Sequence, residues 1–242
     1  MALNKADIRQ QLQKEIFSLQ GFKSTNANIN AGNVELGPIK EVFPNCTFPL
    51  GAVHEFFCAR PETTACTSGF IAGVLSSIMK SGGVTIWICK EPAIFPPALT
   101  SFGIDPEKVI FFYLRKQQEI LWCIEEALKC KGIAAVVAEL RDLDFTSSRR
   151  LQLAASKNNV TCFVLHQPST ATTASVARWK VLPLPSIADD DLPGVGFPQW
   201  SVELLKVRNG KTGTWQVQWT EVSFHFPAAR TSVMLEQRKK AG

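Results

Sequence analysis

The sequence has 242 residues, of which 45% are hydrophobic and 19% charged, which suits one α/β domain and is too apolar for a disordered chain. Its formal net charge of +5 is mildly basic and does not by itself indicate nucleic-acid binding. The first residues lack the apolar core of a secretory signal, and no apolar run is long enough to span a bilayer. We therefore expect a cytoplasmic protein without membrane contacts.

The N-terminal segment repeats apolar residues at near-helical spacing, at Ile8, Leu12, Ile16 and Leu19. This spacing predicts a short amphipathic helix that ends near Gly21, followed by a polar, turn-rich linker over residues 23–33. The chain thus divides into an N-terminal helix and linker (1–34), a core (35–226) and a basic C-terminal tail (227–242). Because the linker lets the helix reach another molecule, its four apolar residues are candidate partner-binding residues.

From Leu36 onward, short apolar runs alternate with amphipathic stretches. The apolar runs predict strands at residues 52–57, 83–89, 109–113, 133–138 and 161–165. The amphipathic stretches predict helices at residues 67–79, 118–130 and 147–157. Such alternation with short connections implies right-handed βαβ crossovers, so we expect an α/β fold with a mainly parallel sheet and flanking helices.

After His166 the pattern changes to apolar runs without intervening helices. Three further strands are predicted at residues 176–182, 200–207 and 214–219. Residues 208–213 contain Asn-Gly, a strong hairpin signal, and residues 183–198 are rich in Pro, Asp and Gly and predict an exposed loop. These strands should add an antiparallel extension to one edge of the sheet.

The segment between the first predicted strand and helix has the position of a phosphate-binding loop, GxxxxGK[ST]. In such a loop glycines let backbone N–H groups approach the phosphates, and the lysine bridges the outer phosphates. The candidate residues here are Arg60, Pro61, Glu62, Thr63, Thr64, Ala65, Cys66, Thr67 and Ser68. Pro61 and Glu62 resemble the loop of the RecA recombinases, GPESSGKTT, but Ala65 stands at a glycine and Cys66 at the lysine.

These departures remove the groups that grip a nucleotide. Cys66 supplies no cation, and Ala65 carries a Cβ where a glycine is expected. Thr67 keeps a hydroxyl that could ligate Mg²⁺, and Arg60 could replace part of the lost positive charge. We expect a strand-to-helix turn in a protein that is no enzyme and has no cofactor or metal, with binding of ATP and Mg²⁺ as the alternative.

The resemblance to RecA extends to five further positions. It implies a general base at Glu91, an acid that orients Mg²⁺ at Glu139, a γ-phosphate sensor at Gln167, and contacts to a neighbouring subunit's nucleotide at Lys206 and Arg208. The two connections that hold single-stranded DNA in RecA are only a few residues long in this sequence. We therefore expect direct DNA binding to be weak, because a DNA groove needs length and basic or aromatic groups.

Several longer strings occur in order along the core, including LGPIKEVFP, TSGFIAGVL, FPPALTSFGIDPEKVIF and PGVGFPQWSVELLKVRNG. Together they resemble the ImuA proteins of bacterial mutagenesis cassettes. That resemblance implies an SOS-inducible accessory factor in error-prone translesion DNA synthesis. It further implies three partners, namely an ImuB-like homologue of Y-family polymerases, an error-prone α-type polymerase subunit, and RecA.

The sequence leaves three functions open. The first is a non-catalytic RecA-like adaptor that is retained for its docking surfaces. The second is an ATP-dependent RecA-like DNA-binding protein that uses Glu91, Glu139 and Gln167 around an unusual loop. The third is a cell-division inhibitor like SulA, which also has a degenerate RecA-like core. The length of the chain and the hairpin at residues 208–213 favour the first.

Overall fold

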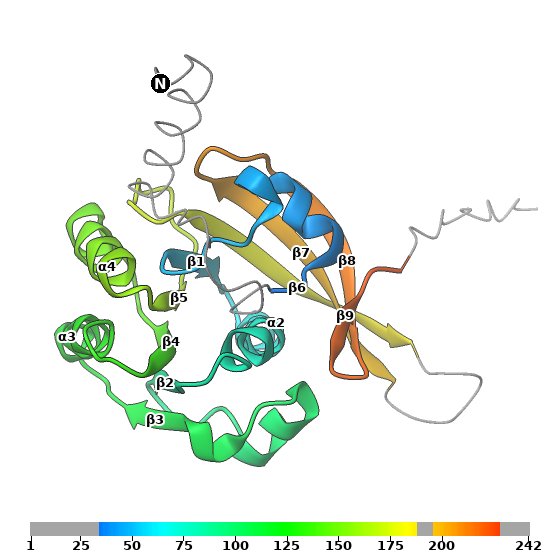
Figure 1. Cartoon of the computed structure of the whole chain (residues 1–242), viewed down its shortest axis with the longest axis horizontal. Coiled ribbons are helices and arrows are strands. Elements are labelled where there is room, and N and C mark those ends of the chain that lie inside the picture. Colours follow the sequence, from blue (N-terminus) through cyan, green and yellow to red (C-terminus); the bar gives the residue numbers. More distant parts are fainter. Residues whose placement is uncertain (1–33, 188–195, 228–242) are drawn as a thin grey trace, which may run out of the picture.

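The computed structural model describes residues 34–187 and 196–227. Within these ranges the chain forms one nine-stranded sheet in the order β3-β2-β4-β5-β1-β6-β7-β8-β9 (Figure 1). The helix predicted around residues 8–19 and the tail beyond residue 227 lie outside the described residues.

Six neighbouring strands of this sheet are parallel. They are β3 (Val109–Tyr113), β2 (Val84–Cys89), β4 (Ile133–Glu139), β5 (Thr161–His166), β1 (Val53–Phe57) and β6 (Ala177–Ile187). The antiparallel strands β7 (Phe197–Val207), β8 (Gly213–Thr220) and β9 (Ser223–His225) follow. The predicted α/β fold, with a mainly parallel sheet and antiparallel edge strands, is thus confirmed.

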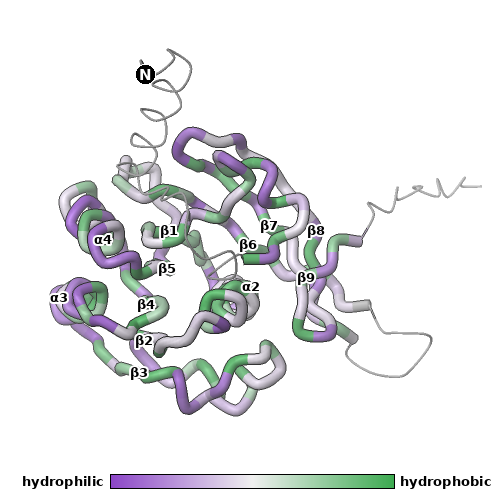
Figure 2. The backbone as a smooth tube through the Cα atoms, viewed as in Figure 1, coloured by the Kyte–Doolittle hydropathy of each residue, from purple (hydrophilic) through white to green (hydrophobic). Residues whose placement is uncertain are grey.

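Helices cover both faces of the parallel part. They are α2 (Pro61–Met79), α3 (Gln117–Ala127) and α4 (Phe145–Asn158), with short 3₁₀ turns η1 (Gly37–Val42), η2 (Pro44–Cys46), η3 (Pro96–Phe102) and η4 (Pro106–Lys108). α3 and α4 lie on one face and α2 on the other (Figure 1). The central strands and the inward sides of the helices are hydrophobic (Figure 2).

Two apolar cores explain why the central strands are apolar at almost every position. On β5, Phe163 belongs to the core beneath α2, whereas its neighbour Val164 belongs to the core beneath α3 and α4. Because successive side chains of a strand point to opposite faces, a strand covered on both faces needs apolar residues in both phases. This is the physical basis of the continuous apolar runs in the sequence.

The β7–β8 hairpin confirms the turn predicted at residues 208–213. Asn209 adopts φ 57°, the left-handed conformation that asparagine tolerates better than most residues. Gly210 allows a close approach, since a Cβ there would lie 2.4 Å from the carbonyl oxygen of Val42. The same carbonyl accepts a hydrogen bond from the Lys211 N–H at 2.9 Å. The hairpin is thereby fastened to η1.

The predicted loop at residues 183–198 was too long. β6 continues to Ile187 and β7 begins at Phe197, so both strands extend into it. On the β1 side, the pairing of β6 stops at Trp179, and the remainder of β6 is bonded only to β7. Prolines are tolerated in such a one-sided strand, which accommodates Pro183 and Pro185.

Candidate functional site

The carboxyl ends of the parallel strands form the edge of the sheet at which α/β proteins bind ligands. β1, β2, β4 and β5 all end there. Residues 60–68 follow β1, Glu91 follows β2, Glu139 ends β4 and Gln167 follows β5. The structure thus brings these predicted groups to one edge of the sheet.

The predicted phosphate-binding segment is mostly helix. α2 begins at Pro61 rather than at the predicted Thr67. Proline suits the first helical position because its fixed φ is helical and its missing N–H is not needed there. The Thr63 hydroxyl donates to the Arg60 carbonyl oxygen at 2.6 Å and accepts from the Arg60 N–H at 3.0 Å. The turn is therefore confined to residues 58–60, and no loop remains to wrap a phosphate chain.

The first turns of α2 direct Thr63, Cys66 and Thr67 into the core. The Cys66 thiol donates to the carbonyl oxygen of Val181 at 3.3 Å. Burial, helped by the nearby thiol of Cys58, raises the pKa of Cys66 to about 11. The thiol is therefore neutral at pH 7, so it supplies no positive charge to phosphate and has little thiolate reactivity.

Thr67 is closed off from solvent. Its side chain is 0% exposed, and its hydroxyl oxygen accepts from the Cys58 thiol at 3.5 Å. A hydroxyl that ligates Mg²⁺ must face the bound nucleotide, whereas this one faces the interior. Of the two substitutes that the sequence suggested for the lost phosphate grip, Arg60 alone lies at the surface.

Glu139 is half-buried at the end of β4. Burial raises the pKa of its carboxyl group above the ordinary value, against the opposing effect of the Lys90 charge. The pKa values of Cys58 and Cys89 are raised mainly by burial and also by Glu139, so its carboxylate lies near the ends of β1 and β2. Glu91 and Gln167 are exposed. Among the described residues, this edge thus carries the carboxyl groups of Glu91 and Glu139, while its cations Arg60 and Lys90 are exposed.

Lys206 and Arg208 lie elsewhere. β7 ends beside Ala177, which pairs with His54 near the start of β1, so both basic residues are remote from the carboxyl ends. The Arg208 guanidinium donates to the carbonyl oxygen of Ala174 at 2.6 Å, and burial lowers its pKa. The structure therefore does not join these two residues to Glu91, Glu139 and Gln167 within one chain.

A polar cluster around Glu55 was not predicted from the sequence. This carboxylate is fully buried in β1, where it accepts hydrogen bonds from His166 Nε2 at 3.1 Å and from the Thr173 hydroxyl. Arg178 Nε lies 3.3 Å from the same carboxylate. Burial alone would raise the pKa of Glu55, but hydrogen bonds from His166, Ser175 and Thr173 and the Arg178 charge lower it overall. The signal available in the sequence was a glutamate inside an apolar strand.

This cluster fastens the connection between β5 and β6 to the core. Besides the bond from Thr173 to Glu55, the N–H of Ala174 donates to the Ser148 hydroxyl at 2.9 Å, and its carbonyl accepts from Arg208. In the resemblance to RecA this connection corresponds to a loop that holds DNA. Here its polar groups bond to the protein itself.

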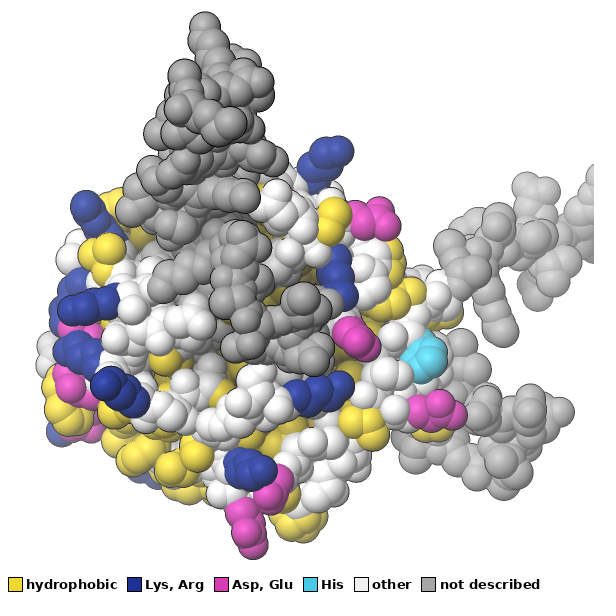
Figure 3. All heavy atoms as spheres, viewed as in Figure 1, with side chains coloured by type: hydrophobic (Ala, Val, Ile, Leu, Met, Phe, Trp, Pro, Cys, Tyr) yellow, Lys and Arg dark blue, Asp and Glu magenta, His cyan; other side chains and the backbone are white. Residues whose placement is uncertain are grey.

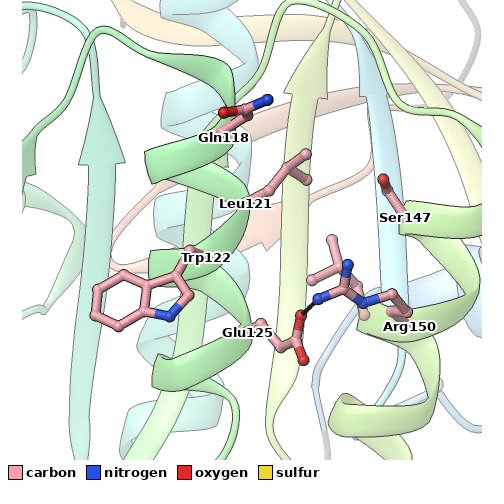
Figure 4. A pocket seen from close by; sticks show the side chains of 7 residues that line it. Gln118, Leu121, Trp122, Glu125, Ser147 and Arg150 are labelled. Atoms are coloured by element: carbon pink, nitrogen blue, oxygen red, sulfur yellow. Dashed lines mark hydrogen bonds and ion pairs between the residues drawn. The ribbon is translucent and has the colours of Figure 1, made fainter.

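A groove of about 170 Å³ lies between α3 and α4, lined by Gln118, Leu121, Trp122, Glu125, Ser147, Arg150 and Leu151. Arg150 pairs with Glu125 across it, whereas Trp122 points away from α4 (Figure 4). Pockets for small ligands are typically at least about 300 Å³, so this groove is too small to enclose one.

Basic side chains gather along this side of the molecule with acidic ones between them, and form no uninterrupted basic track there (Figure 3).

In residues 34–187 and 196–227, no three His, Cys, Asp or Glu side chains gather closely enough to hold a metal ion. Across the same stretches, every helix is too short or too polar to cross a membrane.

Known proteins resemble this chain in sequence and, separately, in fold. No family model matches the sequence. Protein ImuA of Caulobacter vibrioides, in strain NA1000 / CB15N and in strain ATCC 19089 / CIP 103742 / CB 15, is 34% identical over 193 residues, covering 74% of this chain and 79% of that protein. A crystal structure of the RadB recombinase matches with a TM-score of 0.52 at 14% identity, covering 74% of this chain and 92% of that one. The predicted RecA-like fold is thereby confirmed.

Proposed function

The chain belongs to the ImuA family, and from that premise we propose that it is a non-catalytic RecA-like adaptor in SOS-induced, error-prone translesion DNA synthesis. The observation that carries the proposal is the closed start of α2. Cys66 stands at the lysine position with its thiol bonded to Val181, and Thr67 is buried against Cys58. A protein with this junction retains the RecA-like surfaces without a means of gripping the triphosphate that drives a recombinase.

The proposed partners are an ImuB-like relative of Y-family polymerases, an error-prone α-type polymerase subunit, and RecA. The candidate docking residues are Ile8, Leu12, Ile16 and Leu19, which lie outside the described residues. Their support is the apolar spacing in the sequence and the polar linker that follows. A segment on a polar linker can bind one partner while the core binds another, since the linker sets the effective concentration of the second contact.

Titration of the purified chain with ATP and Mg²⁺ tests the loss of nucleotide binding. We expect no saturable binding and no phosphate release above background. The probing variants are Thr67→Val and Arg60→Ala, which remove the two groups that the sequence suggested as substitutes for the lost phosphate grip. Thr64→Val is the matched control, because its hydroxyl bonds to the Arg60 carbonyl oxygen in the same turn. Saturable binding that the probing variants abolish and the control retains would establish the ATP-dependent alternative instead.

Co-purification with the cognate ImuB-like protein tests the adaptor role. We expect a stable complex that Leu12→Asp and Ile16→Asp disrupt, because each places a charge in the apolar series. Gln13→Asp is the control, since it adds the same charge outside that series. Co-purification of a chain without residues 228–242 tests separately whether the basic tail contributes to the complex. No complex with any of the three partners, together with binding of the tubulin-like division protein, would favour the division-inhibitor alternative.

A further inference from the structure

The outermost parallel strand, β3, leaves one backbone edge unpaired within the described residues, since its neighbour in the sheet order is β2 alone. The N–H of Leu114 donates to the carbonyl oxygen of Cys89 on β2 at 3.0 Å. Backbone groups of successive strand residues point to alternate sides. The N–H and C=O groups of Val109, Phe111 and Tyr113 therefore face outward along the open edge.

The side chains at this edge are apolar and exposed. Ile110 is 46% exposed, Phe112 40% and Tyr113 50%. Ile110 and Phe112 pair in register with Ile86 and Ile88, which belong to the core beneath α3, so they lie on the α3 face of the sheet.

Trp122 adds to this surface from α3. It is 67% exposed and points away from α4 (Figure 4). Hydrophobic side chains gather in this region, at the lower left of Figure 3. Proteins usually protect an edge strand with a charge, a proline or a bulge, and the sequence VIFFY of β3 has no charge and no proline.

We infer that β3 pairs with β3 of a second copy of the chain, antiparallel and centred on Phe111, so that one sheet runs through both copies. In this register Phe111 faces its own counterpart, and Val109 faces Tyr113 of the other copy. These are the residues whose backbone groups face outward, so each pair exchanges two hydrogen bonds. Ile110 then faces Phe112 of the other copy in a closely spaced pair, an apolar match on the α3 face.

The charges at the two ends of β3 support a second copy as the occupant. Glu107 lies in the turn η4 before β3 and Arg115 follows the strand, equally far from Phe111 in the sequence, so the proposed register brings the Glu107 end of one copy to the Arg115 end of the other across the twofold axis. Both are exposed, and no ion pair to either occurs within the described ranges, whereas Lys108 and Lys116 pair with neighbours on their own copy, Asp105 and Glu119. A strand that is self-complementary in backbone, apolar side chains and charge fits another copy of itself.

Sedimentation of the full chain over about two decades of concentration measures the dimer. Glu107→Arg alone and Arg115→Glu alone should each weaken association about tenfold, because each turns two attractions into two repulsions. The double reversal should restore it to within about twofold. Phe112→Lys should abolish the dimer, whereas Leu153→Lys, at an exposed apolar position on α4, should leave it intact.

A register-specific crosslink gives an independent readout. Chains carrying Ile110→Cys are mixed with chains carrying Phe112→Cys under glutathione disulfide, which oxidises the two thiols to one disulfide. Such facing, non-hydrogen-bonded pairs have the short Cα separation that a disulfide requires. We expect crosslinked dimer on mixing, above the background of the unmutated chain, and much less from either variant alone. A monomer at every concentration, or a dimer indifferent to Glu107→Arg and Phe112→Lys, would overturn the inference.

Discussion

Polar and apolar groups that could bind another molecule are buried at the start of α2 and exposed along the edge strand β3. At the start of α2, Thr63, Cys66 and Thr67 turn inward and bond to the protein's own backbone and thiols. Along β3, backbone groups and large apolar side chains remain at the surface. At the position of the predicted phosphate-binding loop, these side chains thus contribute to the interior of the protein.

This contrast has a measurable consequence. Groups that are buried and mutually bonded should be costly to change, because each removal leaves a partner unsatisfied in the core. Substitutions at an exposed edge should change the free energy of unfolding little and weaken association strongly.

Replacing Glu55 with alanine should destabilise the fold most, by about 3–5 kcal/mol, because it leaves a largely buried Arg178 without its counter-charge. Urea unfolding followed by circular dichroism at pH 7 measures the loss. Glu203→Ala is the control, since Glu203 lies 3.8 Å from Lys180 in a partly exposed ion pair and should cost less than about 1 kcal/mol. Equal losses in the two variants would mean that the cluster does not hold the β5–β6 connection to the core.

Stability should fall by about 3 kcal/mol as the pH drops from 6.5 to 4, because of His54. Burial lowers the pKa of His54 to about 4, against the hydrogen bond to the Pro49 carbonyl, which raises it. Between these pH values the unfolded chain binds a proton that the folded chain excludes, so stability decreases with acidification. Urea unfolding at pH 7 and at pH 4.5 measures this slope.

The variant His54→Phe should remove most of that pH dependence, because a phenyl ring does not bind a proton. It can occupy the place of the imidazole, which stacks on Phe48 at a centroid distance of 4.5 Å. His225→Gln serves as the control and should leave the slope unchanged, because His225 is exposed. Glu55 adds a separate decrease at lower pH. Its pKa lies below the unfolded value of 4.5, so its stabilisation is complete above that pH and is lost as the pH falls through the folded value. An unchanged slope in His54→Phe would contradict the assignment.

Restoring the lysine of the phosphate-binding motif should lower the stability of the protein. Cys66→Lys places an ammonium group among apolar side chains and should cost about 2 kcal/mol, softened by the reach of the long side chain to solvent. Ala65→Lys is the matched control, exposed in the same turn, and should be nearly neutral. Thermal unfolding compares them. If Cys66→Lys were neutral and gained saturable ATP binding, the junction would be an open phosphate site after all.

The sequence predicted the sheet well because each strand has its own local signal. β5 is apolar in both phases, and the Asn-Gly turn joins β7 to β8. It failed at the start of α2, because the resemblance to a loop outweighed Pro61 and Thr63, which favour an early helix. The partners of Glu55 could not be predicted at all. They come from β5, β6 and the connection between them, and only the folded sheet brings these together.

Phe112→Lys should change the stability of the isolated chain least, by less than about 1 kcal/mol, since much of this side chain is already in water. Unfolding must be followed at concentrations where association is absent. Ile88→Ala is the comparison, because Ile88 pairs with Phe112 in register on the same face but is fully buried, and it should cost about 3 kcal/mol. A loss from Phe112→Lys as large as that from Ile88→Ala would make β3 part of the folding core. The exposed edge of β3 would then contribute to folding as the buried start of α2 does. A small loss of unfolding free energy, together with an abolished dimer, would mean that these exposed side chains stabilise association rather than the fold.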